Sequence, residues 1–158
     1  MRIYISGPLQ GSQNLPEARR FYEMLAASVR AAGCEAYVPH LATDPIESAH
    51  MSSERVFDTD LAALDSADAV IAHIGLPSTG VGAELAIAAA SGRRILGLKR
   101  PGEPSSRFAE GLLLEADSTV ITFRSAAELD DVVRRWLNQP RSWFGCPAAL
   151  RFKQRAIA

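Results

Sequence analysis

The stretch ADAVIAHIGLPSTGVGAELAIAAASG, from Ala67 to Gly92, decides the fold class of this chain. Its first part, Ala67–Ile74, is an apolar run of the length of one buried strand. The run GLPSTG that follows contains the glycine and proline typical of a loop, and the alanine-rich segment Gly80–Ser91 is typical of a helix. A buried strand that leads directly into a helix indicates one unit of a parallel sheet.

The same alternation of strand-like and helix-like segments extends over the rest of residues 1–137. Five strands that alternate with helices predict a single α/β domain, built on a five-stranded parallel sheet with helices on both faces. In such domains ligands bind beyond the carboxyl ends of the strands, here the loops 7–11, 40–52, 75–80 and 100–106. The predicted strands are residues 2–6, 35–39, 67–74, 93–99 and 118–123, and the predicted helices are residues 14–33, 53–66, 80–91, 106–115 and 125–137.

Residues at the helix ends support these boundaries. Asn14 is suited to cap the first helix, with Glu17 three residues further on, and Gly33 is suited to end it. Ser125 and Glu128 have the spacing of a capping box and open the last helix. After that helix comes a tail, residues 138–158, which contains three Arg, one Lys and no acidic residue. We expect this basic tail either to pack on the domain or a neighbouring subunit, or to be disordered.

Composition excludes several classes of protein. The chain has 158 residues, 47% of them apolar and 22% charged, with a net charge of −1, so no charge excess indicates a nucleic-acid polymer or a membrane surface as partner. No apolar run approaches the roughly 18 residues of a membrane span, and the start of the chain lacks the features of a signal peptide. Cys34 and Cys146 form neither a disulfide framework nor a metal-binding spacing, so we expect free thiols and a cytoplasmic location.

Glu84 is the one charged residue in an apolar helix. It lies within the first two turns, where the positive end of the helix dipole favours a carboxylate. Gly80, Gly82 and Ala83 beside it are small enough to admit a ligand. Glu84 is therefore a candidate catalytic residue, and the structural alternative is a carboxylate that pairs with an arginine or caps local amides.

Asp60 is a second acidic residue on an apolar helix side. At about 100° per residue, it shares that side with Val56, Ala63 and Leu64. A buried charge needs a partner, so Asp60 forms either a buried ion pair or hydrogen bond, or part of an active site. Two carboxylates in one crevice suggest glycosidic chemistry, in which one attacks or stabilises an anomeric carbon and the other protonates or positions.

Other catalytic patterns are missing from the sequence. The nucleophile motif GxSxG is absent, and the segment that contains Gly7 and Gly11 matches neither a dinucleotide fingerprint nor a P-loop. The histidines are scattered and no metal-ligand spacing appears, so we expect neither a metal nor an organic cofactor. Hydroxyl side chains that either contact a ligand or cap a loop follow two predicted strands: Ser78, Thr79, Ser105 and Ser106.

Four motifs in consistent order, IYISGPL, DTDLAALDSADAVIA, PSTGVGAELAIA and RRILGLKRP, resemble the nucleoside 2-deoxyribosyltransferase superfamily. The spacing from Pro77 to Glu84 is most similar to its branch of 2'-deoxynucleoside 5'-phosphate N-hydrolases. The resemblance implies a flavodoxin-like (Rossmann-like) sheet, a homodimer, and cleavage of the bond between a nucleobase and C1' of a deoxyribose.

The resemblance also implies roles for particular residues. Glu84 matches the nucleophile of the family, Asp60 matches the aspartate that assists at the base and the sugar, and Tyr4 matches a tyrosine near the nucleophile. Ser78 matches a serine that holds the 5'-phosphate. Ser106 matches a phosphate-binding serine from the other subunit, with a one-residue ambiguity toward Ser105.

The glycines and the first loop complete the expected substrate site. Gly80 and Gly82 would admit the sugar, and the loop of Gly7 is a candidate to face an oxyanion of the substrate with its backbone amides. Pro8 and Gln10 stand where the hydrolase branch has a serine and an arginine on the phosphate, so the bidentate arginine clamp is lost. The leading expectation is cleavage of deoxynucleoside 5'-monophosphates. The alternatives are base exchange between free deoxynucleosides, cleavage of ribonucleotide 5'-monophosphates, and nucleotide binding without catalysis.

Overall fold

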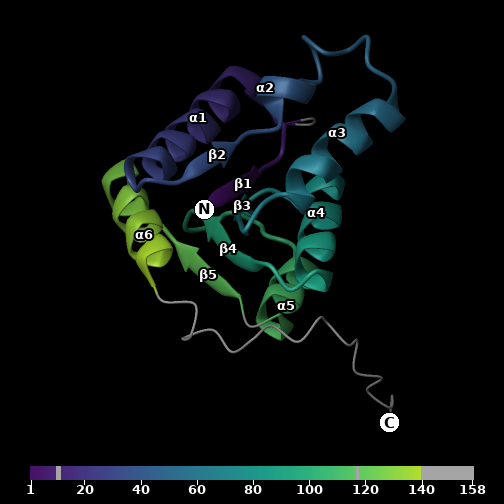
Figure 1. The fold of residues 1–158 in the computed structure, drawn as a ribbon. Coiled ribbons are helices and arrows are strands. Elements are labelled where there is room, and N and C mark those ends of the chain that lie inside the picture. Colours follow the sequence, from purple (N-terminus) through teal and green to yellow (C-terminus); the bar gives the residue numbers. More distant parts are fainter. Residues whose placement is uncertain (10–11, 117, 140–158) are drawn as a thin grey trace.

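A computed structural model describes residues 1–9, 12–116 and 118–139, and it contains the predicted sheet (Figure 1). All strand pairs of this five-stranded sheet are parallel, in the order β2-β1-β3-β4-β5, which is the flavodoxin-like order. The strands are β1 (Arg2–Ser6), β2 (Glu35–Tyr37), β3 (Ala69–His73), β4 (Arg94–Lys99) and β5 (Thr119–Thr122). The helices are α1 (Leu15–Ala31), α2 (His40–Thr43), α3 (Ser53–Asp65), α4 (Thr79–Ala90), α5 (Arg107–Glu115) and α6 (Ala126–Asn138).

The helices form two layers, one on each face of the sheet (Figure 1). Helices α1 and α6 pack on one face and build a core with Ile3 and Ile5 of β1. Helices α3, α4 and α5 pack on the other face, over a core that includes Tyr4 and Val70. Side chains alternate along a strand, so Tyr4 and Ser6 of β1 both face α4.

Helix α4 is the next element after β3 and follows it across a short loop, as the opening stretch predicts. The Ser78 hydroxyl caps it by accepting a hydrogen bond from the amide of Val81. Val81, Leu85 and Ala88 are buried against the sheet. Glu84 lies three residues after Val81 and four before Ala88, so its carboxylate is on the buried side of the helix.

The other predicted helix ends are also observed. The Asn14 side chain accepts a hydrogen bond from the amide of Glu17 at 3.2 Å, and Gly33 follows α1 with a positive φ of 77°. The Ser125 hydroxyl accepts from the amide of Glu128 at 3.2 Å. The Glu128 carboxylate, in turn, accepts from the amide of Arg124 rather than from that of Ser125.

The region after β2 differs from the prediction of a strand to Pro39 and a continuous loop from His40 to Ser52. The strand ends at Tyr37, and the four-residue helix α2 begins at His40. Pro39 has a helical backbone with φ −51° and thus starts this turn. Asp44 precedes a proline and is extended with ψ 133°, which ends the turn. The predicted basic tail lies almost entirely at residues 140–158, outside the described residues, so its role stays a prediction.

Candidate functional site

A cleft of about 560 Å³ lies between α3, α4 and the segment that joins β2 to α3. Its lining includes five of the predicted catalytic and binding residues: Gly7, Asp60, Ser78, Gly80 and Glu84. The first turns of α3 border this cleft, where Phe57 is 56% exposed, whereas Ala63 and Leu64 further along the helix are buried in the core. The structure therefore brings both candidate carboxylates to one cavity.

The Glu84 carboxylate receives two hydrogen bonds from β1. The Tyr4 hydroxyl donates to Glu84 Oε1 at 2.8 Å, and the Ser6 hydroxyl donates to Glu84 Oε2. Tyr4 and Ser6 are both fully buried. Neighbouring side chains on one strand face thus hold both oxygens of the carboxylate.

Ser6 was not among the residues predicted from the sequence. The signal that would have found it is the two-residue period of a strand, because Ser6 lies two positions after Tyr4 on the same face. The expectation that Tyr4 lies near Glu84 therefore implies that Ser6 lies near it as well.

Asp60 receives hydrogen bonds from two other residues that the sequence did not single out. The Tyr37 hydroxyl donates to Asp60 Oδ1 at 3.0 Å, and the Thr43 hydroxyl lies 2.9 Å from Asp60 Oδ2 and 3.1 Å from Oδ1. The rings of Tyr4 and Tyr37 stack with centroids 5.4 Å apart. The residue that donates to Glu84 thus packs directly against one that donates to Asp60.

Burial raises the pKa of both carboxyl groups. For Glu84, hydrogen bonds from Ser6 and Tyr4 oppose the effect of burial, and the negative charge of Asp60 adds to it. For Asp60, hydrogen bonds from Thr43 and Tyr37 oppose it. Burial and the two nearby carboxylates also raise the pKa of the Tyr4 hydroxyl, so Tyr4 remains a proton donor at neutral pH. Two carboxyl groups of raised pKa in one cleft are typical of an acid–base site.

The first loop is packed against helix α1. A Cβ atom on Gly7 would lie 2.2 Å from the ring of Tyr22, so any larger residue would require the ring or the loop to shift. Pro8 is buried outside the cleft lining, and its carbonyl accepts a hydrogen bond from the Tyr22 hydroxyl at 3.2 Å. Gln10 lies outside the described residues, so the predicted substrate contacts of Pro8 and Gln10 stay predictions.

The two serines predicted at the 5' end both cap helices. The Ser78 hydroxyl caps α4, and the Ser106 hydroxyl caps α5 by accepting from the amide of Ala109. Both line a second, smaller cavity of about 90 Å³, together with Gly82 and the 85% exposed Phe108. Ser106 does not line the cleft, but it lies in the smaller cavity with Ser78, which lines both cavities. The predicted contact of Ser106 with the site of a second chain stays a prediction.

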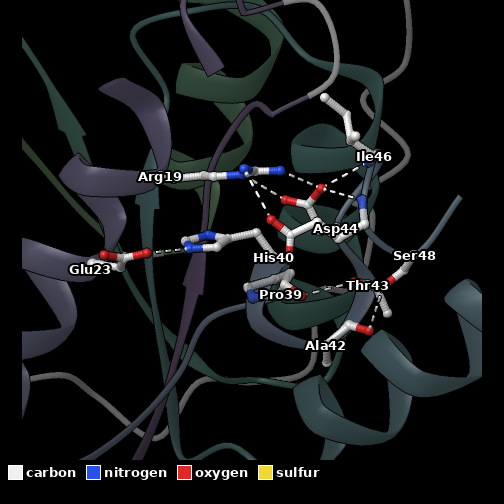
Figure 2. A network of polar contacts seen from close by, with 10 residues as sticks. Arg19, Glu23, Pro39, His40, Ala42, Thr43, Asp44, Ile46 and Ser48 are labelled. Carbon is white, nitrogen blue, oxygen red and sulfur yellow. Dashed lines mark hydrogen bonds and ion pairs between the residues drawn. The ribbon is translucent and has the colours of Figure 1, made fainter. Parts of the chain in front are cut away.

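The wall of the cleft opposite α4 is fixed by an ion pair, shown in Figure 2. The Asp44 side chain is 3% exposed, and its oxygens accept from Arg19 Nε at 2.8 Å and Nη2 at 2.5 Å. Asp44 Oδ1 also accepts from the amides of Ile46 and Glu47. Arg19 is therefore already paired with Asp44 of this wall. The described residues that line the cleft include no Lys, Arg or His.

The other polar clusters lie away from the cleft. Burial lowers the pKa of His73, whose ring contacts the carboxylate of Glu103 at 3.1 Å and the Tyr22 hydroxyl at 3.4 Å. In the part of the chain that the structure describes, no group of three or more metal-binding side chains comes together. No helix there is both long and apolar enough to cross a membrane.

Residues 3–123 match the model of the family described as Nucleoside 2-deoxyribosyltransferase, which confirms the resemblance that the four motifs suggest. A 2-deoxyribosyltransferase from Bacillus psychrosaccharolyticus has the same fold, with a TM-score of 0.58, 22% identity, and coverage of 91% of this chain and 96% of that chain.

Two relatives carry the names of N-hydrolases. A Methanosarcina mazei protein, provisionally named 2'-deoxynucleoside 5'-phosphate N-hydrolase 1, is 34% identical over 52% of this chain and 51% of its own length. The human 5-hydroxymethyl-dUMP N-hydrolase is 34% identical over 63% of this chain and 57% of its own length. The chain thus spans little more than half the length of these two relatives.

Proposed function

Because the chain belongs to the nucleoside 2-deoxyribosyltransferase family, we propose that it is an N-glycosidase of 2'-deoxynucleoside 5'-monophosphates with Glu84 as its nucleophile. The observation that carries this proposal is that two carboxyl groups, each held by hydrogen bonds from hydroxyl groups, lie in one cleft. Glu84 is held at both oxygens by Tyr4 and Ser6, and Asp60 lines the same cavity. The names of the two N-hydrolase relatives support the class of substrate.

The reaction proceeds in two displacements at C1'. In the first, a carboxylate oxygen of Glu84 forms a bond to C1', and the electron pair of the C1'–N bond passes to the base. Asp60 gives its proton to the departing base and becomes a carboxylate. The products of this step are the free base and a glycosyl ester on Glu84.

In the second displacement, water replaces the base. Asp60, now ionised, takes a proton from the water as its oxygen bonds to C1', and the ester electrons return to Glu84. The configuration at C1' is retained after two inversions. An acceptor base in place of water would give a new nucleotide, or a new nucleoside where the substrate has a free 5'-hydroxyl, so hydrolysis and transfer differ only in what enters the cleft.

The 5' end of the substrate lies near the start of α4 in this proposal. The free amides at the helix start and the Ser78 hydroxyl are donors suited to phosphate oxygens. Ser106 of a second chain would add another hydroxyl. Gly7 and Gly80 line the cleft between this end and Glu84, where they leave room for the sugar.

A panel of nucleotides and nucleosides tests the proposal, with free base followed by chromatography. We expect base release from at least one deoxynucleoside 5'-monophosphate, and a loss of about 10³-fold or more in Glu84→Gln, because the amide does not attack C1'. Ribonucleotides in the same panel test the sugar. Full activity in Glu84→Gln, or nucleotide binding by calorimetry without base release from any compound, would contradict the proposal.

Base exchange between free deoxynucleosides is a second candidate. It is favoured by the lining of the cleft, which contains the carboxyl groups of Glu84 and Asp60 and, among the described residues, no basic side chain. Such an environment suits an uncharged 5'-hydroxyl better than a phosphate. Adding a second base to the assay separates the two activities. A new nucleoside in the chromatogram indicates transfer, and free base alone indicates hydrolysis.

A further inference from the structure

The Thr43 hydroxyl lies between two different acceptors at the edge of the cleft. Its oxygen is 2.9 Å from Asp60 Oδ2, and 3.0 Å from the backbone carbonyl of Pro39, as Figure 2 shows for the latter. A hydroxyl has one proton to donate and two lone pairs that accept. Thr43 therefore donates to one of these partners at a time.

This arrangement satisfies Asp60 in both of its protonation states. When Asp60 is ionised, Thr43 donates to the carboxylate. When Asp60 is protonated, the carboxyl donates to the Thr43 oxygen, and the Thr43 proton turns to the Pro39 carbonyl. The Pro39 carbonyl also accepts hydrogen bonds from the amides of Ala42 and Thr43, at 2.9 and 2.8 Å, so the Thr43 hydroxyl shares this acceptor with the backbone of α2.

Glu84 has no such alternative. Among the described residues, the hydroxyls of Ser6 and Tyr4 donate to Glu84 and to no other acceptor. Protonation of Glu84 would leave one of these buried hydroxyls without a full partner, which is costly. The hydrogen bonds thus favour the anion at Glu84 and accommodate a proton at Asp60.

We propose that Thr43 is a positioning residue that enables Asp60 to release and recover the proton of the leaving base. As the Asp60 O–H bond breaks and an N–H bond forms on the base, the Thr43 hydroxyl turns from Pro39 to the new carboxylate. The reverse rotation accompanies proton uptake from water. This inference rests on the proposed function for its catalytic part, and on the observed contacts for the coupling between Thr43 and Asp60.

Three other titratable groups face Asp60, and they define the background of its titration. Tyr37 of β2 donates to it, and Tyr4 of β1 and Glu84 of α4 interact with its charge. The two tyrosines remain protonated in the neutral range because burial raises the pKa of each. Glu84 is the only other carboxyl group among these three, so the measurement has to distinguish its titration from that of Asp60.

A carboxyl titration tests the coupling without any activity. The protein is labelled with ¹³C at aspartate side-chain carboxyls, Asp60 is assigned from the spectrum of Asp60→Asn, and its midpoint is compared between wild type and Thr43→Val. We expect the midpoint to move to higher pH, because the hydrogen bond that Thr43 donates to the ionised form is stronger than the one it accepts from the neutral form, and Thr43 therefore lowers the pKa of Asp60. Thr59→Val is the matched control, since the exposed Thr59 hydroxyl donates to the Arg55 carbonyl and does not touch Asp60. An unchanged Asp60 midpoint in Thr43→Val overturns the proposal.

Kinetics with two leaving groups test the catalytic part. Thr43→Val is expected to lower kcat by roughly tenfold for a nucleotide of uracil and by clearly less for one of 5-fluorouracil, whose more acidic base depends less on protonation. Thr43→Ser, which keeps the hydroxyl, is expected to restore the rate. Equal losses with both bases would show a merely structural role and would overturn the proposal.

The two experiments fail in different ways. If the wild-type protein releases no base, the proposed function fails while the titration still decides whether Thr43 controls the proton on Asp60. If Thr43→Val does not fold, Thr43→Ala removes the same hydroxyl with less bulk, and the same outcomes decide.

Discussion

At the scale of single residues, the environment of Glu84 explains how a carboxylate remains usable in an apolar helix. Burial alone would favour its neutral form. The hydroxyls of Tyr4 and Ser6 reach both of its oxygens and favour the anion. The pKa of Glu84 is still raised, because the effect of burial outweighs that of the two hydrogen bonds.

Ser6→Ala tests this balance. Without the serine donor, the pKa of Glu84 rises further, so the acidic limb of the kcat/KM profile moves to higher pH, and the rate on that limb falls by roughly tenfold. Ile5→Val is a suitable control because Ile5 is buried on the same strand and faces the other side of the sheet. A uniform loss over the whole pH range, with the limb in place, would contradict the role given to Ser6.

Gly7→Ala tests the packing of the first loop. The added methyl group would overlap the ring of Tyr22, so the loop or the ring must shift, and we expect a loss of about 1–3 kcal/mol in the free energy of unfolding. Urea denaturation measures it. Gly111→Ala is the control, because that glycine lies inside α5 with open space around it, and alanine there should stabilise by about 0.5–1 kcal/mol. Equal effects of the two substitutions would contradict the close contact at Gly7.

At the scale of elements, the sequence predicts what depends on local pattern. The strands, the helices and their caps follow from periodicity and from residues such as Asn14 and Ser125. The helix α2 does not, because a four-residue turn bounded by two prolines has no periodicity of its own. The contact between Tyr37 and Asp60 is also beyond local pattern, since it depends on β2 lying beside β1 and on the packing of α3 at the end of both. The strand face shared by Tyr4 and Ser6 was, in contrast, readable.

The ion pair between Arg19 and Asp44 joins α1 to the segment that carries Thr43, so its loss should affect the wall of the cleft. Arg19→Gln leaves the buried Asp44 without its cation, and we expect a lower melting temperature at pH 7. Arg19 holds the pKa of Asp44 below its usual range, although burial alone would raise it. The pair therefore stabilises above the ordinary aspartate pKa, and its contribution is lost as pH falls through the lowered value.

The pH dependence gives this prediction its sign. The difference in melting temperature between wild type and Arg19→Gln should be large at pH 7 and should shrink below pH 4, where Asp44 in the variant is protonated and needs no cation. Arg20→Gln is the control, because Arg20 is an exposed neighbour on the same helix. A difference that grows as the pH falls would contradict this account.

At the scale of the whole molecule, the structure separates two groups of predicted residues. Tyr4, Asp60 and Glu84 meet around the cleft, whereas Ser106 opens into the smaller cavity beside the exposed Phe108. The smaller cavity shares Ser78 and Val81 with the cleft, but Ser106 lines only the smaller cavity. If the predicted homodimer forms, Ser106 of one chain would contribute to the site of the other. This arrangement makes a prediction that a site built from one chain would not fulfil.

Mixing two inactive variants tests this expectation. In a mixed dimer of Glu84→Ala and Ser106→Ala chains, one site would combine an intact Glu84 with Ser106 from the other chain, and the second site would lack both. Random exchange of subunits should then restore about a quarter of the wild-type activity, because half of the dimers are mixed and each has one intact site. If Ser106 acts within its own chain, both sites of the mixed dimer are defective and no activity returns. Sedimentation of the mixture shows whether subunits pair at all, so a monomeric protein would contradict the shared site directly.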